Sequence, residues 1–156
     1  MSENPRDNAG VVAPPPLIFA LPLIAGLAAS WMRQLPIFPG TAGLWAGIAL
    51  VVAGLGLIGA GVIEFRQART AVVPYSPTTA IVSSGPFRFT RNPLYVGFVL
   101  IYVGSSLGAN TFWPFFLLPL ALVVLQRGVI EREERYLERK FGSEYLEYKA
   151  RVRRWV

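Results

Sequence analysis

Residues 85–95 of the chain read GPFRFTRNPLY. This segment is polar and stiffened by two prolines, and it ends where a new apolar run begins. Proline disfavours helical backbone at the residue before it, so the Asn92–Pro93 step predicts a bend just ahead of a helix. Two arginines, an asparagine and a tyrosine at such a junction are typical of a site held at a membrane surface.

The composition predicts an integral membrane protein. The 156 residues are enough for one domain, 53% of them are hydrophobic and only 15% are charged. The apolar residues lie in blocks that approach the ~20 residues needed to cross a bilayer. We therefore expect an all-α membrane protein with about four transmembrane helices and a cytosolic C-terminal helical segment.

Four apolar blocks are the expected spans. A cleaved signal peptide is the alternative for the first block, but no net positive charge precedes it, which favours a retained span. The turn Arg33–Gly40 ends the first block, and Asn110 lies in a tight hairpin between the last two. Pro114 and Pro119 are expected to kink the final span. The blocks are Leu17–Met32, Thr41–Ile63, Leu94–Ala109 and Thr111–Gln126.

The second block contains a glycine pattern that formally matches a dinucleotide-binding fingerprint. Residues 54–59 read GLGLIG. The fingerprint requires a strand before the glycines and a helix that opens at them, whereas this pattern lies inside one apolar helix. We interpret the glycines of this block as small residues that let neighbouring helices approach closely. They are Gly43, Gly47, Gly54 and Gly61.

The chain divides into three expected parts. Residues 1–16 form a flexible tail, residues 17–126 a transmembrane domain with a cytosolic loop at 64–93, and residues 127–156 cytosolic helices that complete a ligand pocket. In the loop, the short extended piece Thr79–Val82 argues against full disorder. In the C-terminal part, Gly142 breaks the helix and Ser143 is a plausible N-cap of a second short helix.

Membrane topology explains the distribution of basic residues better than nucleic-acid binding does. The net charge is +6, and the basic residues gather in the loop and the C-terminal part, while the other connections hold only Arg33. Basic residues accumulate on the cytoplasmic side of spanning helices, so both termini are expected to be cytoplasmic. The short chain with arginine-rich cytoplasmic parts suits a bacterial inner membrane.

Absent residue types limit the possible chemistry. The chain has no cysteine and no histidine. This excludes disulfides, a thiolate nucleophile and a histidine base, and we expect no metal site. Any reaction must use carboxylates, arginines, tyrosines, backbone groups and a bound cofactor.

Glu133 is the most informative single residue. On a helix starting near Arg127, ~100° per residue places its carboxylate in the middle of an apolar face. That face comprises Val129, Ile130, Tyr136, Leu137 and Phe141. The other charges of the helix are expected to form a solvated, ion-paired surface on its flanks and opposite side. They are Glu131, Arg132, Glu134, Arg135, Glu138 and Arg139.

Two interpretations of Glu133 stay open at this point. A carboxylate on an apolar stripe is costly without a partner. It either forms a buried salt bridge to Arg88 or Arg91, or it is kept to hold a cationic or hydroxyl-bearing ligand. The nearby aromatic residues leave a similar choice, because Phe87, Phe89 and Tyr95 could either enclose a flat heterocycle or act as anchors at the membrane interface.

Several of these motifs together resemble a known family. Residues 81–97 contain IVxxGPFRxxRNPLYxG, Glu133 and Glu134 follow on the charged helix, and residues 141–152 contain FGxxYxxYxxxV. Their order and spacing are similar to the isoprenylcysteine carboxyl methyltransferase family and its phospholipid methyltransferase relatives, from about Glu64 to the C-terminus. The resemblance implies an integral membrane enzyme that binds S-adenosyl-L-methionine on the cytoplasmic side.

The resemblance also implies particular site residues. Asn92 stands where eukaryotic members have histidine, and Val129 stands where the family has a substrate-binding arginine. We expect Arg91, Glu133 and Arg127 to carry the chemistry. The cofactor contacts implied are Thr79, Ala80, Ile81, Val82, Phe87, Asn92, Pro93, Leu94, Tyr95 and Glu133.

The expected function is methyl transfer from S-adenosyl-L-methionine to a lipophilic or prenylated substrate that enters from the bilayer. An isoprenylcysteine-type carboxylate is one acceptor and a lipid amine is the alternative. An amine must lose a proton, which Glu133 or Glu134 could take. In a hypothesis of another class, a small non-catalytic membrane protein uses the same motif only for packing. We expect membrane lipids as partners and no nucleic acid.

Overall fold

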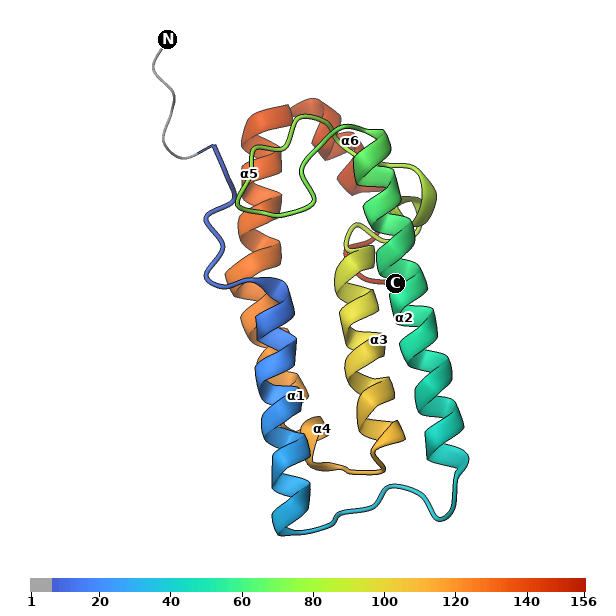
Figure 1. Ribbon diagram of the computed structural model, residues 1–156. Coiled ribbons are helices and arrows are strands. Elements are labelled where there is room, and N and C mark those ends of the chain that lie inside the picture. Colours follow the sequence, from blue (N-terminus) through green and yellow to red (C-terminus); the bar gives the residue numbers. More distant parts are fainter. Residues whose placement is uncertain (1–6) are drawn as a thin grey trace.

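The computed structural model describes residues 7–156, and these are helical without strands. Figure 1 shows the long helices side by side. An isolated backbone bridge joins Thr90 to Arg153, and the expected extended piece Thr79–Val82 pairs with no strand. The elements are α1 (Pro15–Met32), α2 (Ala42–Gln67), the 3-10 helix η1 (Gly85–Arg88), α3 (Pro93–Gly108), α4 (Trp113–Leu125), the π-helical turn η2 (Gln126–Ile130), α5 (Glu131–Phe141) and α6 (Ser143–Arg151).

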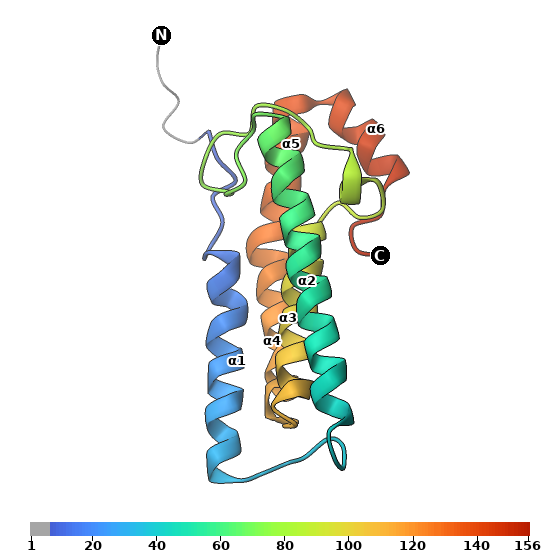
Figure 2. The same ribbon diagram turned by 45° about the vertical axis from the view of Figure 1, so that its right-hand side comes forward.

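The expected all-α membrane architecture is confirmed. Within residues 7–156, three helices are long and apolar enough to span a membrane: Pro15–Met32, Ala42–Gln67 and the continuous helix Trp113–Phe141. The apolar helix α3 is shorter, at 16 residues. The α1–α2 and α3–α4 connections lie at one end of the bundle, and the loop after α2 lies at the other end with α5 and α6 (Figures 1 and 2).

The last apolar block and the charged helix are one continuous helix, contrary to the boundary expected at Gln126. The π-helical turn η2 joins α4 to α5 without interruption. Pro114 lies in the first turn of α4, where its missing N–H is not needed, so it does not break the helix. Pro119 is the proline in the interior of α4.

The α2–α3 interface depends on glycine, as the sequence predicts. Gly43, Gly47, Gly54 and Gly61 are the buried residues of α2. A Cβ atom at Gly47 would lie 2.5 Å from the carbonyl oxygen of Gly104, so the two backbones touch there. The same close approach recurs at Gly54, which faces Gly97. These contacts fix the position of α3, and with it the bend at its start.

Asn110 fastens the opposite end of the bundle. Its φ is 48°, a left-handed conformation that asparagine tolerates better than most residues. Its Oδ1 accepts hydrogen bonds from the N–H groups of Ile37 at 2.9 Å and Phe38 at 3.0 Å, and its Nδ2 donates to the Phe38 carbonyl at 2.9 Å. One side chain therefore ties the α3–α4 hairpin to the α1–α2 connection.

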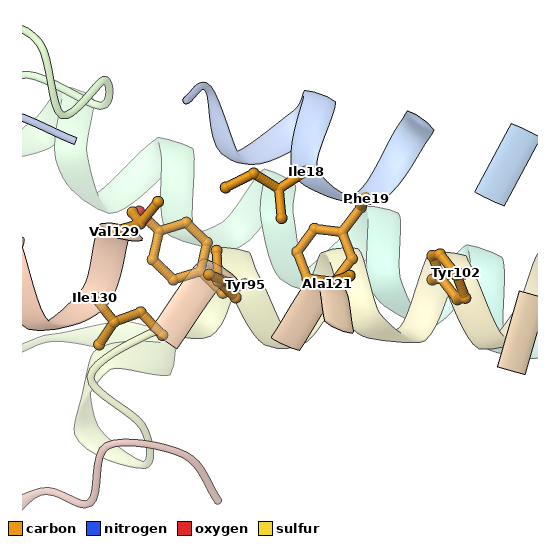
Figure 3. Close-up of a cluster of buried hydrophobic side chains, with 8 residues drawn as sticks. Ile18, Phe19, Tyr95, Tyr102, Ala121, Val129 and Ile130 are labelled. Atoms are coloured by element: carbon orange, nitrogen blue, oxygen red, sulfur yellow. The ribbon is translucent and has the colours of Figure 1, made fainter. Parts of the chain in front are cut away.

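The main core lies where α1, α3 and the α4–α5 helix meet (Figure 3). Tyr102 is 1% exposed, and its hydroxyl donates to the Pro114 carbonyl at 2.7 Å. This core extends along the bundle from Ile18 and Phe19 of α1 to Tyr95 beside the bend. Its buried members are Ile18, Phe19, Tyr95, Tyr102, Ala121, Leu125, Val129 and Ile130.

Three local expectations are wrong. The N-terminal residues from Asp7 onward are bonded to the rest of the protein instead of forming a free tail up to Pro16, and residues 1–6 lie outside the described part. The helix α2 continues four residues into the expected loop, to Gln67. Ser143 is the first residue of α6 and not its cap, because Gly142, with φ +54°, makes the break.

Substitution of Gly47 by alanine tests the α2–α3 interface. Because the added Cβ meets backbone, we expect Gly47→Ala to force the helices apart and lower the free energy of unfolding by about 1–3 kcal/mol. The matched control is Gly56→Ala, since Gly56 lies on the same helix and a Cβ atom added there would meet no atom within 4 Å. Thermal unfolding in detergent should show a lower melting temperature for Gly47→Ala alone, and equal melting temperatures would contradict the packing role.

Candidate functional site

A pocket opens at the end of the bundle that carries the long loop. Its walls come from the loop segment 71–82, from Phe87, from the bend at residues 91–95, and from the facing sides of α5 and α6. Phe87 is 5% exposed, and its ring lies edge-on to Phe65 of α2 with the centroids 5.0 Å apart. The pocket is therefore built from segments that are distant in sequence.

Glu133 faces this pocket and has a single hydrogen-bond partner within residues 7–156. Its Oε1 accepts a hydrogen bond from the Tyr95 hydroxyl at 2.8 Å. None of the ion pairs found among residues 7–156 includes Glu133. Of the two interpretations of Glu133, the salt bridge to Arg88 or Arg91 is therefore wrong.

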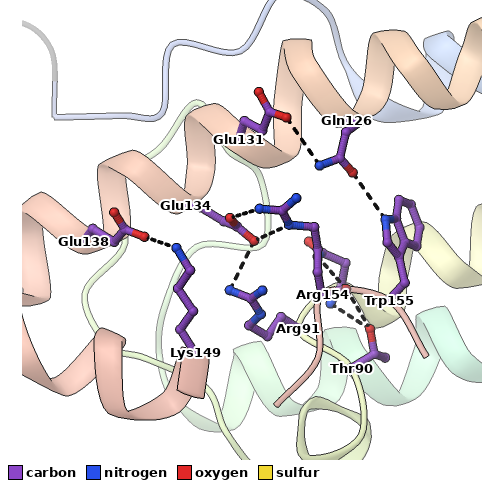
Figure 4. Close-up of polar contacts among 10 residues, drawn as sticks. Thr90, Arg91, Gln126, Glu131, Glu134, Glu138, Lys149, Arg154 and Trp155 are labelled. Atoms are coloured by element: carbon purple, nitrogen blue, oxygen red, sulfur yellow. Dashed lines mark hydrogen bonds and ion pairs between the residues drawn. The ribbon is translucent and has the colours of Figure 1, made fainter. Parts of the chain in front are cut away.

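Its neighbour Glu134 forms the buried ion pairs instead (Figure 4). Glu134 is 6% exposed. Arg154 donates to both carboxylate oxygens, from Nε at 2.9 Å and from Nη2 at 2.7 Å, and Nη1 of Arg91 lies 3.2 Å from Oε1. The prediction that Glu134 belongs to a solvated surface is wrong, because the C-terminal residues fold back over that side of α5. The hydrogen bonds with Glu134 also raise the pKa of Arg154.

The C-terminal residues 152–156, here called the C-terminal strap, hold the bend in place. The Arg91 N–H donates to the Arg153 carbonyl at 2.9 Å. The carbonyl of Arg154 accepts from Thr90 Oγ1 at 3.1 Å and from Asn92 Nδ2 at 2.9 Å. The side-chain amide nitrogen of Asn92 is thus used to hold the C-terminal strap.

Arg91 is buried at the pocket with unused hydrogen-bonding capacity. Its side chain is 9% exposed, and its Nε and Nη1 have no hydrogen-bond partner among residues 7–156. The ion pair with Glu134 compensates charge but does not satisfy these donors. A buried donor without an acceptor costs free energy, so this position suits an anionic or carbonyl group of a ligand.

Two tyrosines of α6 complete the pocket. Tyr145 and Tyr148 are 2% and 5% exposed. Burial raises the pKa of Tyr145 to about 12 and raises the pKa of Tyr148 as well, so both phenols stay neutral near pH 7. The Tyr148 hydroxyl donates to the Phe87 carbonyl at 2.8 Å and so ties α6 to the segment before the bend.

Of the expected catalytic and cofactor-contact residues, all but Thr79 and Arg127 line this pocket. Phe89, considered with Phe87 and Tyr95 as an aromatic wall, is 76% exposed and does not line it. The Thr79 N–H donates to Thr70 Oγ1 at 2.9 Å and its hydroxyl donates to the Arg69 carbonyl, so Thr79 fastens the loop internally. Arg127 lines a separate groove between α3 and the α4–α5 helix. Those that line the pocket are Ala80, Ile81, Val82, Phe87, Arg91, Asn92, Pro93, Leu94, Tyr95 and Glu133.

Sequence reasoning missed several pocket residues. Ala9 and residues 71–74 line the pocket although they belong to no motif, and no sequence signal could have found them. Tyr136 was placed on the correct helix face, and Tyr145 and Tyr148 belonged to the C-terminal motif without an assigned role. Val129 is fully buried in the core and reaches neither the pocket nor the groove. No group of three potential metal-ligating side chains occurs in the described part of the chain.

Comparisons with known proteins agree on one family. The profile of the phospholipid methyltransferase family matches residues 42–144. A protein-S-isoprenylcysteine O-methyltransferase A of Arabidopsis thaliana is 28% identical over 144 residues, which cover 86% of this chain and 71% of that protein. The human protein-S-isoprenylcysteine O-methyltransferase is 36% identical over 87 residues, which cover 49% of this chain and 27% of the human protein.

A third relative is a protein of Haemophilus influenzae with no described function. It is 36% identical over 63 residues, which cover 40% of this chain and all of that protein. No solved structure gives a significant match. The family profile spans α2, the loop that follows it, the bend, α3, the α4–α5 helix and the start of α6, which supply most of the residues that line the pocket. The chain therefore belongs to the phospholipid methyltransferase family of membrane methyltransferases, and the Arabidopsis and human relatives that it matches are named isoprenylcysteine O-methyltransferases.

Proposed function

We propose that this protein transfers a methyl group from S-adenosyl-L-methionine to a lipophilic substrate, an isoprenylcysteine-type carboxylate or a similar acceptor. The observation that carries the proposal is that one pocket holds both a carboxylate outside any ion pair and a guanidinium group with unsatisfied donors. Glu133 presents a carboxylate held only by Tyr95, and Arg91 presents buried donors without an acceptor among residues 7–156.

The pocket fits the chemistry of this methyl donor. S-adenosyl-L-methionine carries a carboxylate, an ammonium, a sulfonium, ribose hydroxyls and a flat adenine. The unsatisfied nitrogens of Arg91 suit the carboxylate, and the carboxylate of Glu133 suits a cationic or hydroxyl group. The apolar side chains of Ile81, Val82 and Phe87 offer a surface for the adenine.

The protein's contribution to the reaction is binding, charge compensation and orientation. When bound, S-adenosyl-L-methionine supplies an electrophilic methyl group on a positively charged sulfur. Glu133 provides a compensating negative charge, and Tyr95 keeps its carboxylate in place. Holding donor and acceptor at fixed positions can supply much of the rate enhancement.

The acceptor is proposed to approach through the groove that Arg127 lines. Val99, Leu122 and Val123 form its apolar wall, and Gln126, Glu131 and Trp155 line the rest. Tyr95 and Val99 are one turn apart on α3, so the groove and the pocket are neighbours. A lipophilic chain fits the apolar wall, and the polar end of the acceptor would meet Arg127.

A lipid amine is the alternative acceptor, and it would need a base. Glu134 is poorly suited to that role because two arginines hold its carboxylate. Glu133 has no such partner within residues 7–156 and is the better candidate. For either acceptor we propose a bacterial inner membrane location with both termini cytoplasmic, in line with the clustering of basic residues at the pocket end.

Replacement of Glu133 by glutamine tests the cofactor site. Loss of a charge-assisted contact costs about 1.5–3 kcal/mol, so S-adenosylhomocysteine should bind at least about tenfold more weakly to Glu133→Gln. Isothermal titration calorimetry on the detergent-solubilised protein measures this. Glu131→Gln is the matched control, because Glu131 lies on the same helix and lines the groove instead of the pocket. Equal affinities for wild type and Glu133→Gln would remove Glu133 from the site.

The identity of the acceptor is tested by the stability of the methylated product. Membranes are incubated with purified protein, methyl-labelled S-adenosyl-L-methionine and a lipid extract, and the labelled lipid is treated with mild base. A carboxylate acceptor gives a methyl ester, which base hydrolyses with release of labelled methanol. Label that survives the base indicates a methylamine and favours the alternative. If wild-type protein neither binds S-adenosylhomocysteine nor labels any lipid, the protein is not a methyltransferase and the motif serves packing.

A further inference from the structure

The described N-terminal residues 7–12, here called the N-terminal strap, cross the rim of the pocket. Four of its residues bond to neighbouring segments, and two of their partners, Pro74 and Tyr136, line the pocket. The Ala9 N–H donates to the Pro74 carbonyl at 3.3 Å, and Arg132 Nη1 donates to the Gly10 carbonyl at 2.8 Å. The Val12 N–H donates to the carbonyl of Gly128, in the π-helical turn, at 3.1 Å. Figures 1 and 2 show the strap beside α5 and the loop that follows α2.

Asp7 begins a chain of hydrogen bonds that reaches the pocket wall. Its carboxylate accepts from the Tyr136 hydroxyl at 2.8 Å and from Lys140 Nζ at 2.7 and 2.8 Å. The same Tyr136 hydroxyl accepts from the Thr78 backbone N–H at 3.1 Å. Tyr136, Thr78 and Ala9 all line the pocket, so Asp7 holds the strap, α5 and the loop together at one point.

The two straps of the protein differ in how firmly they are held. In the pair that anchors the N-terminal strap, the side chains of Asp7 and Lys140 are 44% and 28% exposed. The side chain of Glu134, which anchors the C-terminal strap, is only 8% exposed, although that of its partner Arg154 is 35% exposed. Exposed ion pairs are screened by water and contribute little, while a broken buried pair is costly. The N-terminal strap is thus held less firmly than the C-terminal strap.

We propose that the N-terminal strap is the movable wall of the cofactor pocket, and that Asp7 is the positioning residue that holds it closed through Tyr136 and the Thr78 backbone. This inference rests on the proposed function. Cofactor exchange then proceeds by release of the Asp7 contacts, and the strength of these contacts sets the residence time of the bound nucleoside.

The test is the dissociation rate of labelled S-adenosylhomocysteine, measured by dilution into excess unlabelled ligand. Asp7→Ala should raise this rate roughly two- to fivefold, the range that one exposed ion pair covers. The association rate should change less. Asp7→Glu, which keeps the carboxylate, should restore part of the residence time. Asn8→Ala is the matched control, because the Asn8 side chain bonds only to Gly10 within the described residues.

A double-mutant cycle tests whether Asp7 acts through the Tyr136 hydroxyl or only by destabilising the protein in general. Tyr136→Phe removes the hydroxyl that joins Asp7 to Thr78, so the combination of Asp7→Ala with Tyr136→Phe should be no faster than the faster single variant. If the two substitutions multiply each other's effect on the dissociation rate, Asp7 does not act through Tyr136, and the proposal is overturned. A lower melting temperature with unchanged dissociation would show a purely structural role and overturn the proposal, while wild-type binding would leave the proposed function standing. If the wild type binds no S-adenosylhomocysteine, both fail together.

Discussion

The buried carboxylate of Glu134 between two guanidinium groups is the interaction on which the pocket depends. It joins the bend, the middle of α5 and the C-terminal strap, which the chain order keeps far apart. A carboxylate at this depth is costly unless it is paired, so the fold must deliver Arg91 and Arg154 to it. The ion pair leaves Nε and Nη1 of Arg91 without a hydrogen-bond partner among residues 7–156. These nitrogens are what the pocket offers to an anionic ligand group.

The helices α2 and α3 next to the pocket are held by close backbone packing and not by ion pairs. The glycines of α2 let its backbone touch that of α3, and Gly61 of α2 lies against Leu94 just after the bend. Small residues at helix contacts are a general device of membrane proteins, because apolar burial gives little drive for association within lipid. The pocket therefore combines a fixed floor of packed helices with walls held by a few polar contacts. Such an arrangement places reacting groups reproducibly while allowing a ligand to enter.

Much of the fold could be predicted because its signals are local. The first three apolar blocks located α1, α2 and α3 to within a few residues. The position of Gly43, Gly47 and Gly54 inside one block indicated helix packing, not a nucleotide fingerprint. The boundary at Gln126 was wrong, since the change from apolar to charged residues marks where the helix leaves the apolar layer and not where it ends. Ser143 was wrong as a cap because Gly142 already supplied the break through its positive φ.

By itself, the sequence determined that the protein is a helical membrane protein, that a stiff polar bend precedes α3, and that Glu133 lies on the inner face of its helix. Those properties follow from hydropathy, proline geometry and helical periodicity, which act over a few residues. Only the tertiary structure decided which of two adjacent glutamates forms the ion pairs and which is left to the pocket. That choice depends on where Arg91 and Arg154 arrive in space, and on the strap that brings Arg154 back. Periodicity on one helix carries no information about either.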